Sequence, residues 1–356
     1  MIIEFHSINF FKLMTDIEQV KKELSDHGYE YIDTIGSGSF STVYLCQSTQ
    51  YKNYFAVKQV LKQELVDHEI DSLISLIHPN IVKLYLTFSN QEYQFLVMEY
   101  CSKGTIKQRQ KLNYNEFIFY AKQLLEVLEY CHKQKIAHRD IKPDNIFLDQ
   151  YNHVKLGDFG LSCKFRNQEL SSHKCGSLMF CAPEILSNPE FDPFPADIWS
   201  LGITFYYMAT GHYPFPDHSL ESLRDSIING VIDFTLDDVH PKIQYLIRKM
   251  TSKNTLFRPL ADQLLKFPVF SQSVHTKITK TISSYPFNLI HQIKNAQIWN
   301  QSRNISDTFS STDDKDDDKE SENKKRKKIS KIRSFRNCNC YINEYKKNYQ
   351  HFVKYD

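Results

Sequence analysis

The segment from Ile198 to Met208 is apolar on nearly every side, and this feature limits the possible folds more than any other. A helix at the surface of a protein keeps a polar face, so a helix without one must be enclosed by other parts of the chain. A second segment, from Glu116 to Gln134, has the apolar spacing of an amphipathic helix. The sequence therefore predicts a largely helical domain that is big enough to bury a central helix.

The chain ahead of these helices has strand patterning instead. Short runs rich in β-branched and aromatic residues predict strands at Tyr31 to Ile35, Thr42 to Cys46, Phe55 to Val60, Ile81 to Phe88 and Tyr93 to Tyr100. Helical periods predict a helix from Lys62 to Ile77 and a short one from Asp16 to Asp26, ended by Gly28. We therefore expect an α+β fold with two lobes, a small β-rich lobe with one helix at residues 29–100 and a larger α-helical lobe at residues 101–271.

Composition and charge narrow the class of protein. With 356 residues and 41% apolar side chains the chain can bury a sizeable core, and its net charge of +2 gives no general attraction to nucleic acid or to an anionic membrane. No stretch approaches the roughly 18 consecutive apolar residues of a spanning helix. Residues 1–28 are expected to form an N-terminal extension and not a signal peptide. We expect a soluble, cytoplasmic protein with scattered free thiols.

The composition changes after Phe270, and residues 272–356 are expected to form a partly disordered tail. An acidic run from Asp313 to Glu322 precedes a basic run from Lys324 to Lys328. The basic run fits either a nuclear-import or phosphate-binding cluster or, as for most charge runs, a solvated segment. Pro286 to Trp299 has the pattern of a helix that either packs on the larger lobe or binds a partner.

Two features of the small lobe suit phosphate binding. Gly36 and Gly38 join two predicted strands, and only glycine lets backbone amides approach phosphate oxygens closely, although an ordinary hairpin turn explains the pair as well. Lys58 ends an apolar strand, and Glu69 falls among the apolar positions of the next helix. Since an unpaired buried carboxylate is costly, we predict an ion pair between Lys58 and Glu69 that holds the ammonium towards a phosphate.

The most specific pattern lies in the larger lobe. The stretch from His138 to Asn145 reads His-Arg-Asp-Ile-Lys-Pro-Asp-Asn and places a candidate base, a cation and a metal ligand on one short loop. Asp158-Phe159-Gly160 supplies a carboxylate for a divalent metal, thirteen residues after Asn145. The intervening Val154 to Leu156 predicts a short strand. Chance does not readily account for the whole set.

In this order and spacing, the motifs resemble those of the eukaryotic protein kinases across about 240 residues. The resemblance implies the bilobal kinase fold, ATP and Mg²⁺ as cofactors, and protein substrates. It implies catalytic roles for Asp140 as the base that orients the substrate hydroxyl and for Lys142 at the transferring phosphoryl group. It also implies that Lys58, paired with Glu69, contacts the ATP phosphates.

The same resemblance assigns the metal ions to Asn145 and Asp158, and the nucleotide to the small lobe, the hinge and the strand below it. The nucleotide-binding residues that it implies are Ile35, Gly36, Ser37, Gly38, Ser39, Phe40, Ser41, Thr42, Val43, Ala56, Lys58, Met98, Glu99, Cys101 and Phe147. Val43 and Ala56 would cover the adenine from above, and Phe147 would lie beneath it.

Other family motifs have supporting roles. At the hinge, Glu99 and Cys101 are expected to act through their main chain more than through their side chains. The motif from Ala182 to Glu184 and the motif from Asp197 to Gly202 would brace the larger lobe, with Arg258 paired to Glu184. These residues are not expected to take part in the chemistry.

Single positions within the family motifs indicate the type of substrate and the mode of regulation. Lys142, two residues after Asp140, is the pattern of serine/threonine kinases, and Cys175-Gly176-Ser177 looks most like the calcium/calmodulin-dependent and AMP-activated group. Arg139 usually indicates that a phosphate on the activation segment is read there, and we expect an upstream kinase to phosphorylate Ser172.

Two departures from the family pattern bear on the site. Ser41 replaces the third glycine of the phosphate loop, far from the transferring phosphate, so we still expect an active site. The acidic residue that often follows the hinge and favours basic substrates is Thr105 here, although Asp144 keeps one acidic group near the peptide groove. Substrate preference and oligomeric state are left open.

Two non-enzymatic alternatives remain, and neither is favoured. A pseudokinase scaffold that binds ATP without transferring phosphate would normally have lost Lys58, Asp140 or Asp158, and all three are present. A nucleic-acid-binding protein would need basic and aromatic residues arrayed on a folded surface, and the acidic run beside the basic run in the tail argues against that use.

Overall fold

The computed structural model describes residues 17–38, 41–62, 76–165, 169–172, 175–215, 219–235 and 237–271. Several predictions concern other residues. Ser39, Phe40, Glu69, most of the helix predicted between Lys62 and Ile77, and the tail from residue 272 onward lie outside the described residues.

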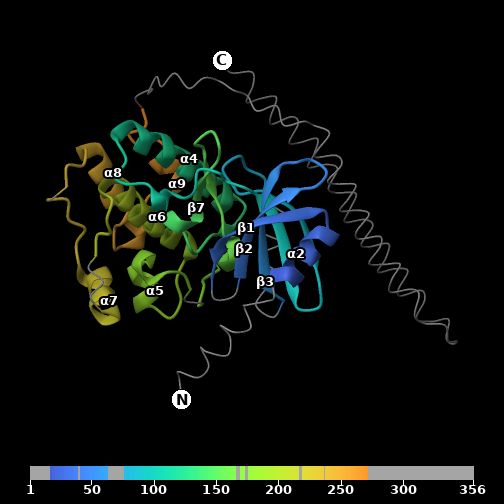
Figure 1. The fold of residues 1–356 in the computed structure, drawn as a ribbon. Helices are drawn as coiled ribbons and strands as arrows, with labels where there is room; N and C mark the ends of the chain where they lie inside the picture. The colour runs from blue at the N-terminus through green and yellow to red at the C-terminus, as the bar shows by residue number, and fades with distance from the viewer. Residues whose placement is uncertain are drawn as a thin grey trace, which may run out of the picture. The chain divides into compact units, whose positions relative to one another are not determined.

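An antiparallel sheet forms the small lobe (Figure 1). Its strands, in the spatial order β1-β2-β3-β5-β4 within the described residues, are β1 (Tyr29–Ser37), β2 (Ser41–Ser48), β3 (Tyr54–Leu61), β4 (Leu84–Ser89) and β5 (Tyr93–Glu99). All five predicted strands are found. β4 begins later than predicted because Ile81 pairs with Leu156 of β8 (Val154–Leu156) in a separate parallel bridge. This bridge ties the small lobe to the larger one.

A helix that precedes the sheet covers one of its faces. The predicted short helix is α2 (Ile17–Asp26), which lies beside the blue strands of the sheet in Figure 1. Its Val20 and Leu24 are buried against aromatic residues of the sheet. His27 stacks on Phe88 with ring centroids 3.9 Å apart. The extension is therefore part of the small lobe's core from Ile17 onward.

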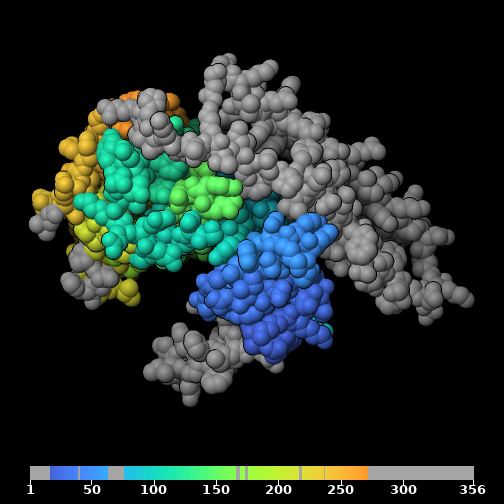
Figure 2. Space-filling model, turned by 45° about the horizontal axis from the view of Figure 1, so that its top comes forward, coloured from blue at the N-terminus to red at the C-terminus, as the bar shows by residue number. Residues whose placement is uncertain are grey.

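The larger lobe is mainly helical. Its helices, within the described residues, are α4 (Tyr114–Lys133), α5 (Pro183–Ser187), α6 (Pro193–Thr210), α7 (Leu220–Asn229), α8 (Pro241–Met250) and α9 (Ala261–Leu264). Its short strands are β6 (Ile136–Ala137), β7 (Ile146–Leu148), β8 and β9 (Cys163–Lys164). Short 3₁₀ turns join them at η1 (Ile106–Gln108), η2 (Pro143–Asn145), η3 (Phe159–Leu161), η4 (Leu178–Phe180) and η5 (Thr255–Phe257). Figure 2 shows the blue small lobe beside the green and yellow larger lobe.

The predicted central helix is α6, and almost its whole length is buried. The Asp192 side chain caps its start by accepting a hydrogen bond from Phe194 N–H, and Gly211 ends it with φ +86°, a conformation that favours glycine. Trp199 and Phe205 are 1% and 0% exposed. The prediction of a buried helix from Ile198 to Met208 is confirmed. α6 also packs against β6 and η4, which lie next to the catalytic residues in the sequence.

The predicted pair of Arg258 and Glu184 is confirmed as a buried, bidentate ion pair. The two guanidinium nitrogens of Arg258 lie 2.5 and 2.7 Å from the Glu184 carboxylate oxygens. Arg258 Nε donates to the Ser252 carbonyl at 2.6 Å, and the guanidinium lies 5.0 Å from the Trp199 ring. The pair therefore links α5, which carries Glu184, to the segment after η5, which carries Arg258, and Arg258 also contacts Trp199 of α6.

No helix in the described part of the chain is long and apolar enough to cross a bilayer.

Candidate active site

The loop between β6 and β7 carries the most specific motif, and a buried carboxylate fixes its backbone. Asp197 of α6, only 1% exposed, accepts hydrogen bonds from the backbone N–H groups of His138 and Arg139, each at 2.8 Å. His132 Nε2 lies 3.0 Å from the same carboxylate. Arg139 has φ +66°, an uncommon conformation for a side chain other than glycine. Asp197 thus holds the strained backbone that precedes Asp140.

Three polar side chains converge on Asp140. Lys142 Nζ and Asn145 Nδ2 donate to its Oδ2 at 2.7 and 3.0 Å, and Asn145 Nδ2 also donates to the Asp140 carbonyl at 2.8 Å. Ser177 donates to Asp140 Oδ1 through its N–H at 3.1 Å and its hydroxyl at 3.2 Å. Lys142 Nζ also donates to Ser177 Oγ at 2.9 Å. The carboxylate is therefore held in one orientation by the motif loop and by the segment of Ser177.

A glycine brings the segment of Ser177 against the motif loop. Gly176 has φ +94°, and a Cβ there would lie 2.5 Å from the Arg139 carbonyl oxygen. No side chain fits at that distance, so only glycine allows Ser177 to reach Asp140.

Asp158 lies at the turn between β8 and η3, in the left-handed conformation with φ +57° and ψ +68°. Phe159 is fully buried against His138, whose ring centroid is 4.7 Å away, and this contact fixes the turn. Lys58 Nζ lies 3.0 Å from Asp158 Oδ1. Burial acts to raise the pKa of Asp158, but the charge and hydrogen bond of Lys58, together with the charges of His138 and Lys142, outweigh it, so the pKa lies below its ordinary value. Asp158 is therefore a stable carboxylate facing the lysine.

Sheet register gathers four of the predicted nucleotide residues, Val43, Ala56, Lys58 and Met98, on one face. Lys58 pairs with Val43 across β2 and β3, and Ala56 pairs with Met98 across β3 and β5. Side chains alternate along a strand, so Ala56 and Lys58 point to the same face. The glycine hairpin above them is closed by Gly38 N–H donating to the Ser41 carbonyl at 2.8 Å. Of the predicted hairpin residues, Ile35, Gly36, Ser37, Gly38, Ser41 and Thr42 are described.

Phe147 packs against Gly157, a glycine that the sequence pattern did not single out. A Cβ at Gly157 would lie 2.8 Å from Phe147 Cε2 and 2.9 Å from Val82 Cγ2. Such contacts are too short, so the ring of Phe147 occupies space that any other residue at position 157 would need. The large ring of Phe147 therefore requires a residue without a side chain at position 157.

The hinge contains a side-chain contact that the sequence reasoning also missed. Glu99 Oε1 lies 2.7 Å from Lys155 Nζ of β8, and both side chains are nearly buried. Glu99 N–H donates to the Lys83 carbonyl at 2.9 Å. Cys101, two residues on, is largely buried, which raises the pKa of its thiol to about 12 and keeps it protonated at neutral pH. The side chain of Glu99 therefore joins the hinge to the strand that leads to Asp158.

Asn145 and Asp158 offer the donor atoms that Mg²⁺ prefers. Since Asn145 uses its amide nitrogen on Asp140, its Oδ1 is the atom left for a metal, and Asp158 contributes a carboxylate. The described residues contain no group of three or more His, Cys, Asp or Glu side chains able to enclose a metal alone. Mg²⁺ usually keeps waters and substrate phosphates among its ligands, so two protein ligands fit it.

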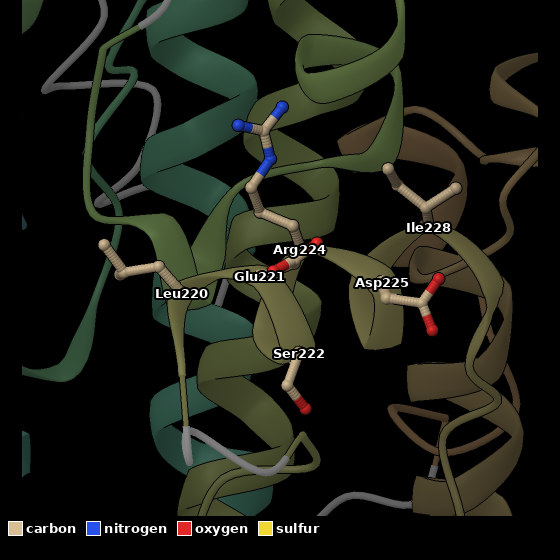
Figure 3. A pocket seen from close by; sticks show the side chains of 6 residues that line it. All are labelled: Leu220, Glu221, Ser222, Arg224, Asp225 and Ile228. Atoms are coloured by element: carbon tan, nitrogen blue, oxygen red, sulfur yellow. The ribbon is translucent and has the colours of Figure 1, made fainter.

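A separate hollow lies on α7, away from these motifs (Figure 3). It is lined by Leu220, Glu221, Ser222, Arg224, Asp225 and Ile228. None of the residues predicted for catalysis, metal or nucleotide binding lines it, so we do not assign it to the active site.

Comparison with known proteins identifies the family. Residues 29–270 match the family model described as the protein kinase domain. The chain belongs to the protein kinase family, as its motifs predict.

Individual relatives agree with this membership. The chain is 33% identical over 258 residues to the "Carbon catabolite-derepressing protein kinase" of Candida tropicalis, which covers 69% of this chain and 41% of the relative. It is 35% identical over 250 residues to the protein of that name from Saccharomyces cerevisiae, covering 67% and 39%. It is 33% identical over 248 residues to "Sperm motility kinase 3A" of Mus musculus, covering 67% and 49%. The chain thus spans less than half the length of these relatives.

Proposed function

We propose that this chain is an ATP-dependent protein serine/threonine kinase, with Asp140 as the base. The observation that supports this most is the arrangement around Asp140, whose carboxylate is oriented by Lys142, Asn145 and Ser177 through hydrogen bonds of 2.7–3.2 Å. A kinase has little covalent work to do, because its catalysis is almost entirely positioning and charge stabilisation.

Each residue has a distinct task in the proposed reaction. A serine or threonine hydroxyl of the substrate would bind at Asp140, which orients it and accepts its proton as the oxygen attacks the γ-phosphorus. Lys142, 2.7 Å from Asp140, would neutralise charge that develops on the transferring phosphoryl group. Positioning of this kind can be worth about 7–11 kcal/mol of the barrier. Lys58 would bind the phosphates of ATP from the small lobe.

Other residues of the site would hold the metal and the nucleotide. Mg²⁺, when bound, neutralises the phosphate charge, and Asn145 and Asp158 would supply its protein ligands. The adenine would lie between Val43 and Ala56 above and Phe147 below, and the main chain at Glu99 and Cys101 would bond its edge. Glu69 remains the proposed partner of Lys58, although it lies outside the described residues.

Phosphorylation of Ser172 by an upstream kinase is the proposed route of activation. Ser172 is exposed, while its neighbour Ser171 is buried and pairs with Phe191 through two backbone hydrogen bonds of 2.8 and 3.0 Å. Arg139 would read the phosphate, and it now donates from Nε to the Leu161 carbonyl at 2.5 Å. Full activity of a Ser172→Ala protein after treatment with activating kinases would rule this out.

The test of the proposed function is transfer from labelled Mg·ATP to a generic protein substrate, followed by identification of the phosphorylated residue type. We expect phosphoserine and phosphothreonine, with no phosphotyrosine. A Lys142→Ala protein is the matched control and should lose most of the transfer while keeping its fold. Phosphotyrosine as the main product would contradict the assignment of substrate type.

A further inference from the structure

One lysine of the larger lobe stands close to the place where a substrate chain must pass. Lys107 belongs to η1, and η1 packs against η2, which ends at Asn145. Asp144 of η2 is exposed, and its carboxylate attracts the Lys107 ammonium. Since η1 packs against the loop that carries Asp140, a protein chain that presents a hydroxyl to Asp140 would come close to Lys107.

Two stacked tyrosines hold the lysine in place. The rings of Tyr207 and Tyr213 stack with centroids 5.1 Å apart, and Lys107 Nζ lies 5.1 and 4.4 Å from those centroids. Lys107 Nζ donates a hydrogen bond to Tyr213 Oη, and Tyr207 Oη donates to the Lys107 carbonyl at 2.9 Å. We call Lys107, Tyr207 and Tyr213 the lysine–tyrosine cluster. An ordinary surface lysine is free to swing away, whereas this one is fixed.

The lysine–tyrosine cluster also touches the segment that orients Asp140. The edge of Tyr213 meets the ring of Phe180 at 5.6 Å, and Phe180 follows Ser177 by three residues in η4. The ammonium is thus fixed relative to the catalytic loop on one side and to the Ser177 segment on the other.

Lys107 supplies a positive charge at this point, beside the exposed carboxylate of Asp144. Burial acts to lower the pKa of Lys107, but the Tyr213 hydrogen bond and the charge of Asp144 outweigh it, so the pKa lies above its ordinary value and the amine is cationic. None of the ion pairs of the described residues joins Lys107 to Asp144. An ammonium has three donors, and Tyr213 uses one of them. Thr105, just ahead of η1, is uncharged and gives a basic substrate no compensation.

We infer that Lys107 is a specificity-determining residue that binds an acidic side chain of the protein substrate near the phosphorylated serine or threonine and disfavours arginine or lysine there. The inference rests on the proposed kinase function and names its substrate class. Attraction of a carboxylate and repulsion of a guanidinium act in the same direction, so the two substrates are discriminated by both effects.

The experiment compares peptides that share a central serine and carry glutamate or arginine at each neighbouring position in turn. Transfer rates to each pair are measured with the wild-type chain, with Lys107→Met, which keeps length and loses charge, and with Lys107→Glu. Lys122→Met on the exposed side of α4 is the matched control, since Lys122 has a side chain 58% exposed and lies outside the site. The ratio of rates within a pair is independent of the fraction of active protein.

For at least one position we expect the wild-type chain to favour glutamate over arginine by about fivefold or more, the weight of one partly exposed ion pair. Lys107→Met should bring this ratio close to one, Lys107→Glu should invert it, and Lys122→Met should leave it unchanged. An unchanged ratio in both Lys107 variants, or a preference for arginine at every position, overturns this inference while leaving the kinase function intact. A wild-type chain that phosphorylates neither peptides nor a generic protein, even after treatment with an activating kinase, refutes the kinase function itself.

Discussion

Breaking the buried ion pair between Glu184 and Arg258 should destabilise the larger lobe severely. Both side chains are almost inaccessible, with exposed fractions of 7% for Glu184 and 0% for Arg258. Glu184→Gln keeps the size of the side chain but leaves the guanidinium buried without its counter-charge. Removing one partner of such a pair costs about 3–5 kcal/mol of unfolding free energy. For a domain of this size that corresponds to a fall in melting temperature of about 6–20 °C.

The assay is thermal and urea unfolding of the purified chain, followed by tryptophan fluorescence, because Trp199 lies 5.0 Å from the Arg258 guanidinium. The matched control is Asp262→Asn, which breaks the exposed pair of Asp262 and Lys266 at 3.2 Å, with side chains 39% and 75% exposed. That pair should contribute at most about 1 kcal/mol. A Glu184→Gln protein no less stable than the Asp262→Asn protein would refute the reasoning from burial.

Three further predictions concern the site and its surroundings. Gly157→Ala should weaken ATP binding by about fivefold or more, because its Cβ would meet the Phe147 ring at 2.8 Å, and adding Phe147→Leu should restore the KM for ATP. Asp197→Asn should lower kcat by about tenfold or more with a smaller change in the KM for ATP, because the backbone ahead of Asp140 loses a charged acceptor. Burial and Lys155 lower the pKa of His78 from 6.5 to about 4, so the folded state resists its protonation. The unfolding free energy should therefore fall as pH drops from 6.5 towards 4, and less steeply in His78→Asn, by urea unfolding across that range.

Elements that repeat a local pattern were predictable from the sequence. The all-round apolar character of α6 could only mean burial, and the strands of the small lobe are runs rich in β-branched and aromatic residues. The motif around Asp140 was found because its members are neighbours in the sequence, from His138 to Asn145.

Contacts between distant parts of the chain were not predictable in the same way. Glu99 and Lys155 are each ordinary charged residues in a strand, and only the paired lobes bring them to 2.7 Å. The same holds for Lys107 and Tyr213, which lie far apart in the sequence and meet beside the catalytic loop. Such pairs depend on how the lobes pack, and single-sequence periodicity carries no signal for them.

Gly157 is a third kind of feature that could not be predicted from the sequence. Its missing side chain gains meaning only from the Phe147 ring on the neighbouring strand, at 2.8 Å from a hypothetical Cβ. The sequence alone gives no sign of this role, whereas the structure gives Gly157 a packing reason.

The measurement that tests the central claim most directly separates nucleotide binding from phosphate transfer in an Asp140→Asn protein. Because Asp140 orients the substrate hydroxyl and does not contact the adenine in the proposed arrangement, the variant should bind Mg·ATP as the wild type does and transfer no measurable phosphate to serine or threonine. Transfer at the wild-type rate in the Asp140→Asn protein would contradict the assignment of the base. A wild-type chain that binds Mg·ATP but transfers no phosphate, even after treatment with an activating kinase, would indicate a pseudokinase.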